Sequence, residues 1–188
     1  MKNLVKLSLL AILFIAFSCK KDDDGGTPEE VNEEEVITTV LVVLTSGSDT
    51  VTLSYVDIDG DGPGEAVLSV TGSLQANTTY QGAITFTNAT ENPPEDITAE
   101  INEEDDEHQV FYLPGSGLNA TFNYENFDGD GNPLGTLFSV DTGDASEGSL
   151  NIVLRHEPNK PNDGTLADAG GETDISVLFD GDNKIVIE

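Results

Sequence analysis

Short apolar segments separated by turn residues recur from Val36 onward, and this pattern constrains the fold more than any other feature. In several segments apolar and polar residues alternate, as at Val51, Leu53 and Tyr55, which is the period of a strand with one buried face. Glycine, proline, asparagine and aspartate stand between the segments and favour tight turns. The pattern predicts an all-β protein, a single Ig-like β-sandwich over residues 36–188. We expect strands at 36–44, 51–56, 66–70, 80–86, 108–113, 120–124, 135–140, 150–155, 173–179 and 184–187.

One segment, 93–101, departs from the strand pattern. It begins with two prolines and two acids, and Ile97 and Ile101 would share one face of a helix. We therefore predict one short helix inserted between strands. The acidic run Glu103–Glu107 follows and would place negative charge at the negative end of the helix dipole, so we expect the helix to end early.

The N-terminal segment 1–18 is typical of a secretory signal peptide. Lys2 and Lys6 precede an apolar run from Leu7 to Phe17, which is too short to span a bilayer, and Ser18 offers a small residue before a cleavage site. Residues 19–35 are rich in glycine and acids, and repulsion between like charges keeps such a segment extended. We expect 19–35 to be a flexible acidic tether that precedes the sandwich.

Cys19, the only cysteine, directly follows Ser18. The segment Ala16–Cys19 resembles the lipobox of bacterial lipoproteins, although leucine is commoner where Ala16 stands. The resemblance implies that the Cys19 thiol is acylated and anchors the protein in a membrane. A cleaved signal with a chance cysteine is the alternative.

The polar segment after Cys19 adds a second resemblance. Two lysines and three aspartates follow the cysteine, and this start resembles the export tag of Bacteroidota surface lipoproteins. It implies the outer membrane facing the cell exterior, with a periplasm-facing anchor as the alternative. Taken whole, the chain resembles small acidic flavobacterial lipoproteins, a group without an assigned activity. The resemblance therefore implies a location and not a reaction.

Charge and composition exclude several classes of function. The formal net charge of −29 disfavours nucleic acid, because phosphate binding needs clustered cations. Apart from Cys19 there is no cysteine, and Met1 is the only methionine, which excludes blue-copper and soft Cu(I) sites in the processed chain. A membrane partner through the lipid anchor and a protein or glycan partner remain compatible with this composition.

Two loops rich in aspartate and glycine are candidate calcium sites. The segment 57–65 carries carboxylates at alternate positions, which suits a hard cation that takes six to eight oxygens. It resembles the calcium hairpins of integrin-type β-propeller repeats, and the resemblance implies side-chain ligands Asp57, Asp59, Asp61 and Glu65 with the carbonyl of Pro63. A weaker copy offers Asn126, Asp128 and Asp130. The alternative for both loops is ordinary hairpin-turn chemistry.

The two histidines of the chain, His108 and His156, form a third candidate site with Glu157. Two imidazoles and a carboxylate bind Zn²⁺ or Cu²⁺ if the fold brings them together. Sequence alone favours the simpler interpretation, in which one histidine lies at a strand edge and the other in a loop.

No nucleophile elbow or phosphate-binding glycine loop is present, so we expect neither an enzyme nor an organic cofactor. Three hypotheses follow. The first is a non-catalytic, lipid-anchored envelope module, stabilised by calcium, that contacts a protein or glycan. The second is a lipoprotein that captures a metal or small ligand through His108 and His156. The third is a purely structural envelope lipoprotein.

Overall fold

The computed structural model describes residues 35–60 and 64–188. The predicted signal peptide, Cys19 and nearly all of the predicted tether lie outside the described residues. Among the described residues no helix has the length and apolarity needed to cross a membrane. The strands are β1 (Thr39–Ser46), β2 (Asp49–Val56), β3 (Val67–Thr71), β4 (Thr79–Thr87), β5 (His108–Pro114), β6 (Ala120–Tyr124), β7 (Leu137–Thr142), β8 (Ser146–Gly148), β9 (Leu150–His156), β10 (Glu172–Phe179) and β11 (Ile185–Ile187).

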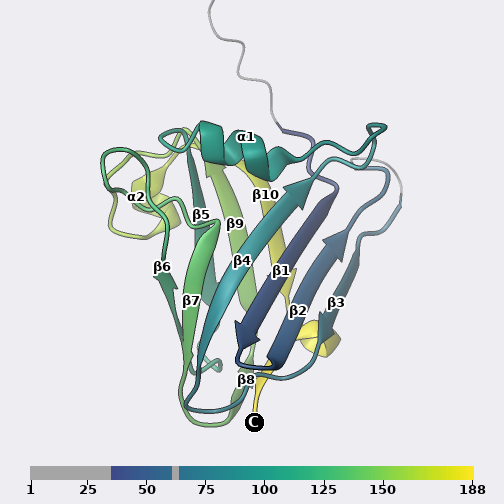
Figure 1. The fold of residues 1–188 in the computed structure, drawn as a ribbon, viewed down its shortest axis with the longest axis vertical. Coiled ribbons are helices and arrows are strands. Elements are labelled where there is room, and N and C mark those ends of the chain that lie inside the picture. The colour runs from purple at the N-terminus through teal and green to yellow at the C-terminus, as the bar shows by residue number, and fades with distance from the viewer. Residues whose placement is uncertain (1–34, 61–63) are drawn as a thin grey trace, which may run out of the picture. The chain divides into compact units, whose positions relative to one another are not determined.

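The strands form two principal antiparallel sheets and one short accessory sheet (Figure 1). The larger sheet has six strands in the order β3-β2-β1-β4-β7-β6, and the smaller has three in the order β10-β9-β5. The short strands β8 and β11 pair with each other. The larger sheet thus has more strands than the four-on-three arrangement of constant-type immunoglobulin domains.

One apolar core lies between the two principal sheets. Strand β1 shows why it forms: Val40, Val42 and Leu44 are buried, and they alternate with residues that face outward. The smaller sheet contributes inward residues such as Leu154 and Phe179 to the same cluster. Burial of this alternating face removes apolar surface from water, which is the main favourable term in folding. The β-sandwich predicted from the sequence is confirmed.

The outer face of the smaller sheet is also covered. Helix α2 (Leu166–Ala169) lies in the segment between β9 and β10, and Ala169 packs with Phe111 and Val153 in a second apolar cluster. Strand β5 is therefore buried on both faces over its first five residues. A strand in such an environment has a continuous apolar pattern and not an alternating one.

Helix α1 (Ile97–Glu103) lies across one end of the sandwich, above the ends of β5, β9 and β10 (Figure 1). Ile97 and Ile101 are buried in the core, as predicted for one face of a helix. The helix begins at Ile97, later than the expected segment 93–101, and it ends at Glu103, the first residue of the acidic run. Because β5 begins, β9 ends and β10 begins beneath α1, residues from all three strands meet at this end of the sandwich.

Candidate metal centre

His108 and His156 lie next to each other at the covered end of the sandwich. They are register partners in the antiparallel pairing of β5 with β9, and their rings stack with centroids 4.7 Å apart and planes inclined by 20°. His108 is fully buried and His156 is 8% exposed. His108 does lie at an edge, because it begins β5, the edge strand of the smaller sheet. The placement of His156 in a loop is wrong, because His156 is the last residue of β9.

Asp174 of β10 supplies a carboxylate to this pair. The register between β10 and β9 shifts between Thr173 and Ile175, so Asp174 is the extra residue of a β-bulge, a device that re-aims a side chain. Its side chain is 1% exposed, and Asp174 Oδ1 lies 3.9 Å from His156 Nδ1. Gly171, with φ of +68°, brings the start of β10 against the backbone of His156 and Glu157, where a Cβ would not fit.

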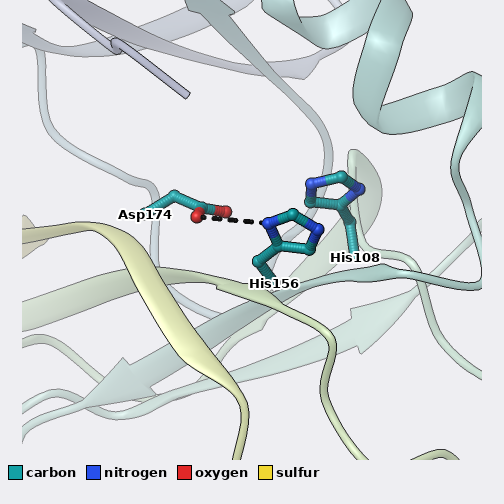
Figure 2. Close-up of side chains that lie close together, drawn as sticks. All are labelled: His108, His156 and Asp174. Carbon is teal, nitrogen blue, oxygen red and sulfur yellow. Dashed lines mark ion pairs between the residues drawn. The ribbon is translucent and has the colours of Figure 1, made fainter. Parts of the chain in front are cut away.

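One nitrogen of each imidazole faces away from Asp174 toward an acceptor. His108 Nδ1 lies 3.1 Å from the carbonyl oxygen of Glu104, and His156 Nε2 lies 3.8 Å from the Glu107 carboxylate. These acceptors favour a proton on the outer nitrogens, which leaves lone pairs on His108 Nε2 and His156 Nδ1. Figure 2 shows one nitrogen of each ring on the side of Asp174. Metal-binding histidines commonly have their outer nitrogen fixed in this way.

The inner nitrogens of both rings are buried without hydrogen-bond partners among the described residues. This holds for His108 Nε2 and for His156 Nδ1. A buried polar atom without a partner costs about 1–3 kcal/mol. Burial also lowers the pKa of His108, with a further lowering from His156, although the carbonyl of Glu104 acts in the opposite direction. His108 is therefore neutral near pH 7, which is the form that binds metals.

His108, His156 and Asp174 fit the donor set of a transition-metal ion. One ligand atom from each lies within 4.8 Å of the others, whereas ligands 2.0–2.1 Å from a tetrahedral Zn²⁺ are separated by about 3.4 Å. An ion lies in the plane of each imidazole that binds it, so the two nearly parallel rings must turn as the site contracts. Two imidazoles and one carboxylate suit Zn²⁺, Cu²⁺ or Fe²⁺.

A second group of donors adjoins the first and shares His108. One ligand atom each from Glu35, Glu104 and His108 lies within 4.8 Å of the others. Burial, together with the negative charges of the Glu100, Asp174, Glu104 and Glu95 carboxylates, raises the pKa of Glu35 to about 7. Negative charge thus concentrates beside the histidines, and a bound cation would relieve it.

Glu157, the carboxylate predicted to join the histidines, lies outside this cluster. It is exposed and adopts a positive φ of 49° after β9 ends, and its backbone N–H donates to Glu107 O. Sequence reasoning missed Asp174, Glu35 and Glu104. The available signal for Asp174 was that it is the one carboxylate within the strand expected at 173–179, whereas Glu35 was assigned to the tether.

The first calcium candidate is only partly within the described residues, since Asp61 and Pro63 lie outside them. Asp59 Oδ2 accepts a hydrogen bond from the backbone N–H of Gly64 at 3.0 Å. Glu65 is exposed. Asp57 Oδ2 accepts a hydrogen bond from the Tyr55 hydroxyl at 3.4 Å. Calcium binding at this loop stays a prediction.

In the second calcium candidate, protein donors already satisfy the central carboxylate. Asp128 Oδ1 accepts hydrogen bonds from the backbone N–H groups of Asp130 and Asn132, and Lys160 Nζ lies 3.4 Å from Asp128 Oδ2. Asp130 is exposed, and the Asn126 amide oxygen accepts hydrogen bonds from the backbone N–H groups of Gly135 and Leu137. This arrangement favours the alternative interpretation, ordinary turn chemistry, with Lys160 beside the Asp128 carboxylate.

The chain matches no protein-family model, and comparison with curated proteins and with solved structures finds no significant match.

Proposed function

We propose that this protein is a lipid-anchored outer-membrane protein whose sandwich domain captures a divalent transition-metal ion, with Zn²⁺ as the best-fitting ion. The observation that supports the proposal is the convergence of two buried imidazole nitrogens without partners on the carboxylate of Asp174. This function is the second of the hypotheses drawn from the sequence. The proposed ligand set differs from that hypothesis in one residue, because Asp174 takes the place of Glu157 beside the two histidines.

The position of the site favours tight holding of an ion. His108 and His156 project from paired strands of the core, and Asp174 projects from the neighbouring strand. Ligands on strands are held more precisely than ligands on loops. The strongly negative charge of the chain also raises the local concentration of cations near the surface and speeds their arrival.

The anchor follows from the sequence at Cys19, and its test is fractionation of cells that produce the Cys19→Ser variant. The unaltered protein is expected in the outer-membrane fraction. The lipoprotein resemblance implies two or three acyl chains on Cys19, and more than one chain gives stable attachment. The serine variant is expected in the soluble fraction of the envelope. A serine variant that stays with the membrane would show that the anchor lies elsewhere. Calcium at 57–65 and a protein or glycan partner remain secondary proposals.

The metal function is tested by a matched pair of variants, Asp174→Asn and Glu157→Gln. Each removes one negative charge at the same end of the molecule, but only the first removes a proposed ligand. We expect Asp174→Asn to weaken Zn²⁺ binding about tenfold or more, and Glu157→Gln to change it by about twofold at most. The measurement is isothermal titration of the metal-free protein with Zn²⁺, repeated with Cu²⁺ and Fe²⁺ under anaerobic conditions.

Two results would contradict the proposal. The first is an unaltered protein that takes up none of these ions at micromolar concentration. The second is an equal loss of affinity in both variants, which would indicate attraction by the general negative charge and not ligation by Asp174. Preferred uptake of Cu²⁺ or Fe²⁺ over Zn²⁺ would support the proposed metal site and would contradict the choice of Zn²⁺ as its ion.

A further inference from the structure

Glu35 brings a carboxylate to the metal centre from the segment that leads into β1. Its Oε2 is shielded from water and has no hydrogen-bond partner among the described residues. One of its oxygens belongs to the group formed with Glu104 and His108, in which the ligand atoms lie within 4.8 Å of one another. His108, which is fully buried, belongs both to this group and to the group with His156 and Asp174.

We propose that Glu35 is the fourth protein ligand of the metal ion, beside His108, His156 and Asp174. The inference rests on the proposed metal function and specifies it further. Structural zinc sites are almost always four-coordinate with protein ligands, and the three residues from β5, β9 and β10 supply only three. Because Glu35 comes from the segment before β1, a four-ligand site would join both sheets of the sandwich.

Glu35 fits this role better than the neighbouring Glu104. The Glu104 side chain is exposed, and this residue already contributes its backbone carbonyl as the acceptor of His108 Nδ1. An exposed carboxylate is well solvated and gains little from a nearby cation. The buried oxygen of Glu35 has lost its water without gaining a protein donor, so a metal ion would restore the missing interaction.

A polar pocket beside the centre supplies a path from solvent. It has a volume of about 320 Å³ and is lined by residues from the start of the domain, from β2 with the turn after it, and from β10. Glu35, Asp57 and Asp174 are among its lining residues. Glu35 and Asp174 therefore belong both to the pocket and to the donor groups, and an ion that enters the pocket meets them before it reaches the imidazoles.

The test compares Glu35→Gln with Glu104→Gln in the full chain, solubilised in detergent and freed of metal. Both substitutions replace a carboxyl group beside His108 by an amide and keep the size of the side chain. Zn²⁺ affinity is measured by competition with a fluorescent chelator, and coordination is followed by the visible absorption of the Co²⁺-loaded protein. Thermal melting without metal accompanies both measurements.

We expect Glu35→Gln to raise the dissociation constant for Zn²⁺ about tenfold or more, and Glu104→Gln to change it by about twofold at most. The Co²⁺ spectrum is expected to change in Glu35→Gln alone. Without metal, Glu35→Gln is expected to melt at the same or a higher temperature, because it removes a poorly solvated charge. Weaker binding by a protein that is no less stable cannot come from misfolding.

Unchanged affinity and an unchanged Co²⁺ spectrum in Glu35→Gln would overturn the assignment, even if the unaltered protein binds Zn²⁺ tightly. An equal loss in both variants would also overturn it, because the effect would then be one of charge and not of ligation. An unaltered protein that binds no Zn²⁺ would remove the proposed function itself and this inference with it.

Discussion

His108→Ala is expected to weaken Zn²⁺ binding about a thousandfold, a loss of roughly 4 kcal/mol of binding free energy. The substitution removes the ligand common to both donor groups. Glu104 O contacts the outer nitrogen of this ring and orients it. The variant therefore lacks a neutral imidazole that is already oriented for binding. The measurement is titration of the metal-free variant with Zn²⁺, together with its metal content after dialysis against a chelating buffer.

Gln109→Ala provides the matched control on the same strand. Gln109 is 1% exposed, like its neighbour, but its side chain contacts Tyr124 and Asn162 on the other face of β5. Both substitutions therefore remove a buried polar side chain from one strand, and only His108→Ala removes a ligand. Retention of Zn²⁺ by His108→Ala, or an equal loss in Gln109→Ala, would contradict the assigned site.

Lys160→Met is expected to lower the free energy of unfolding by about 3 kcal/mol, the effect of leaving a buried charge without its partner. Lys160 and Asp128 have side chains only 6% and 1% exposed. Burial alone would raise the pKa of Asp128, but hydrogen bonds from Asn132 and the charge of Lys160 hold it below its usual range. The hydrogen bonds from Asn132 remain when the ammonium is removed, and they continue to favour the ionised carboxylate. Chemical denaturation of the metal-free variant measures the loss.

Lys184→Met is the control for this prediction. Lys184 Nζ lies 2.9 Å from Glu147 Oε1, but these side chains are 39% and 62% exposed. Water screens such a pair, and its loss is expected to cost at most about 1 kcal/mol. Equal effects of the two substitutions would show that Lys160 is not the counter-ion of Asp128. The double variant Lys160→Met with Asp128→Asn should recover part of the stability.

Much of the fold could be predicted from local pattern, because apolar periodicity directly reflects which face of a strand is buried. The strand expected at 120–124 matches β6, and the strand expected at 108–113 differs from β5 only by Pro114. Strand β8 and helix α2 were missed. They have three and four residues, too few to establish a period.

The metal centre could not be predicted from local pattern, because it depends on how distant segments pair. His108 and His156 meet only because β5 and β9 are neighbours in this register. In the alternation of β10, Asp174 precedes Ile175 and would face away from the core side. The β-bulge changes this direction, and no residue in the sequence marks a bulge there. Glu157 was predicted instead because it is next to His156 in the sequence. The chain turns after β9, and Glu157 is exposed outside the donor cluster.

Calcium binding at the loop 126–132 stays a prediction, but the structure shows a limit of this local motif. Alternate acids and glycines predicted a cation beside Asp128. The structure supplies a positive charge, but it is the ammonium of Lys160, from a loop far along the chain. A short acidic motif indicates that its carboxylates need a positive charge nearby. It does not indicate whether that charge comes from an ion or from a side chain of the protein.

Crystals of the Zn²⁺-loaded protein, measured on both sides of the zinc absorption edge, are the strictest test of the proposed metal centre. One anomalous peak is expected within about 2.0–2.2 Å of His108 Nε2, His156 Nδ1 and an oxygen of Asp174, with both rings turned from their stacked arrangement. Zinc peaks confined to surface carboxylates, with the two imidazoles still stacked and no metal between them and Asp174, would contradict it.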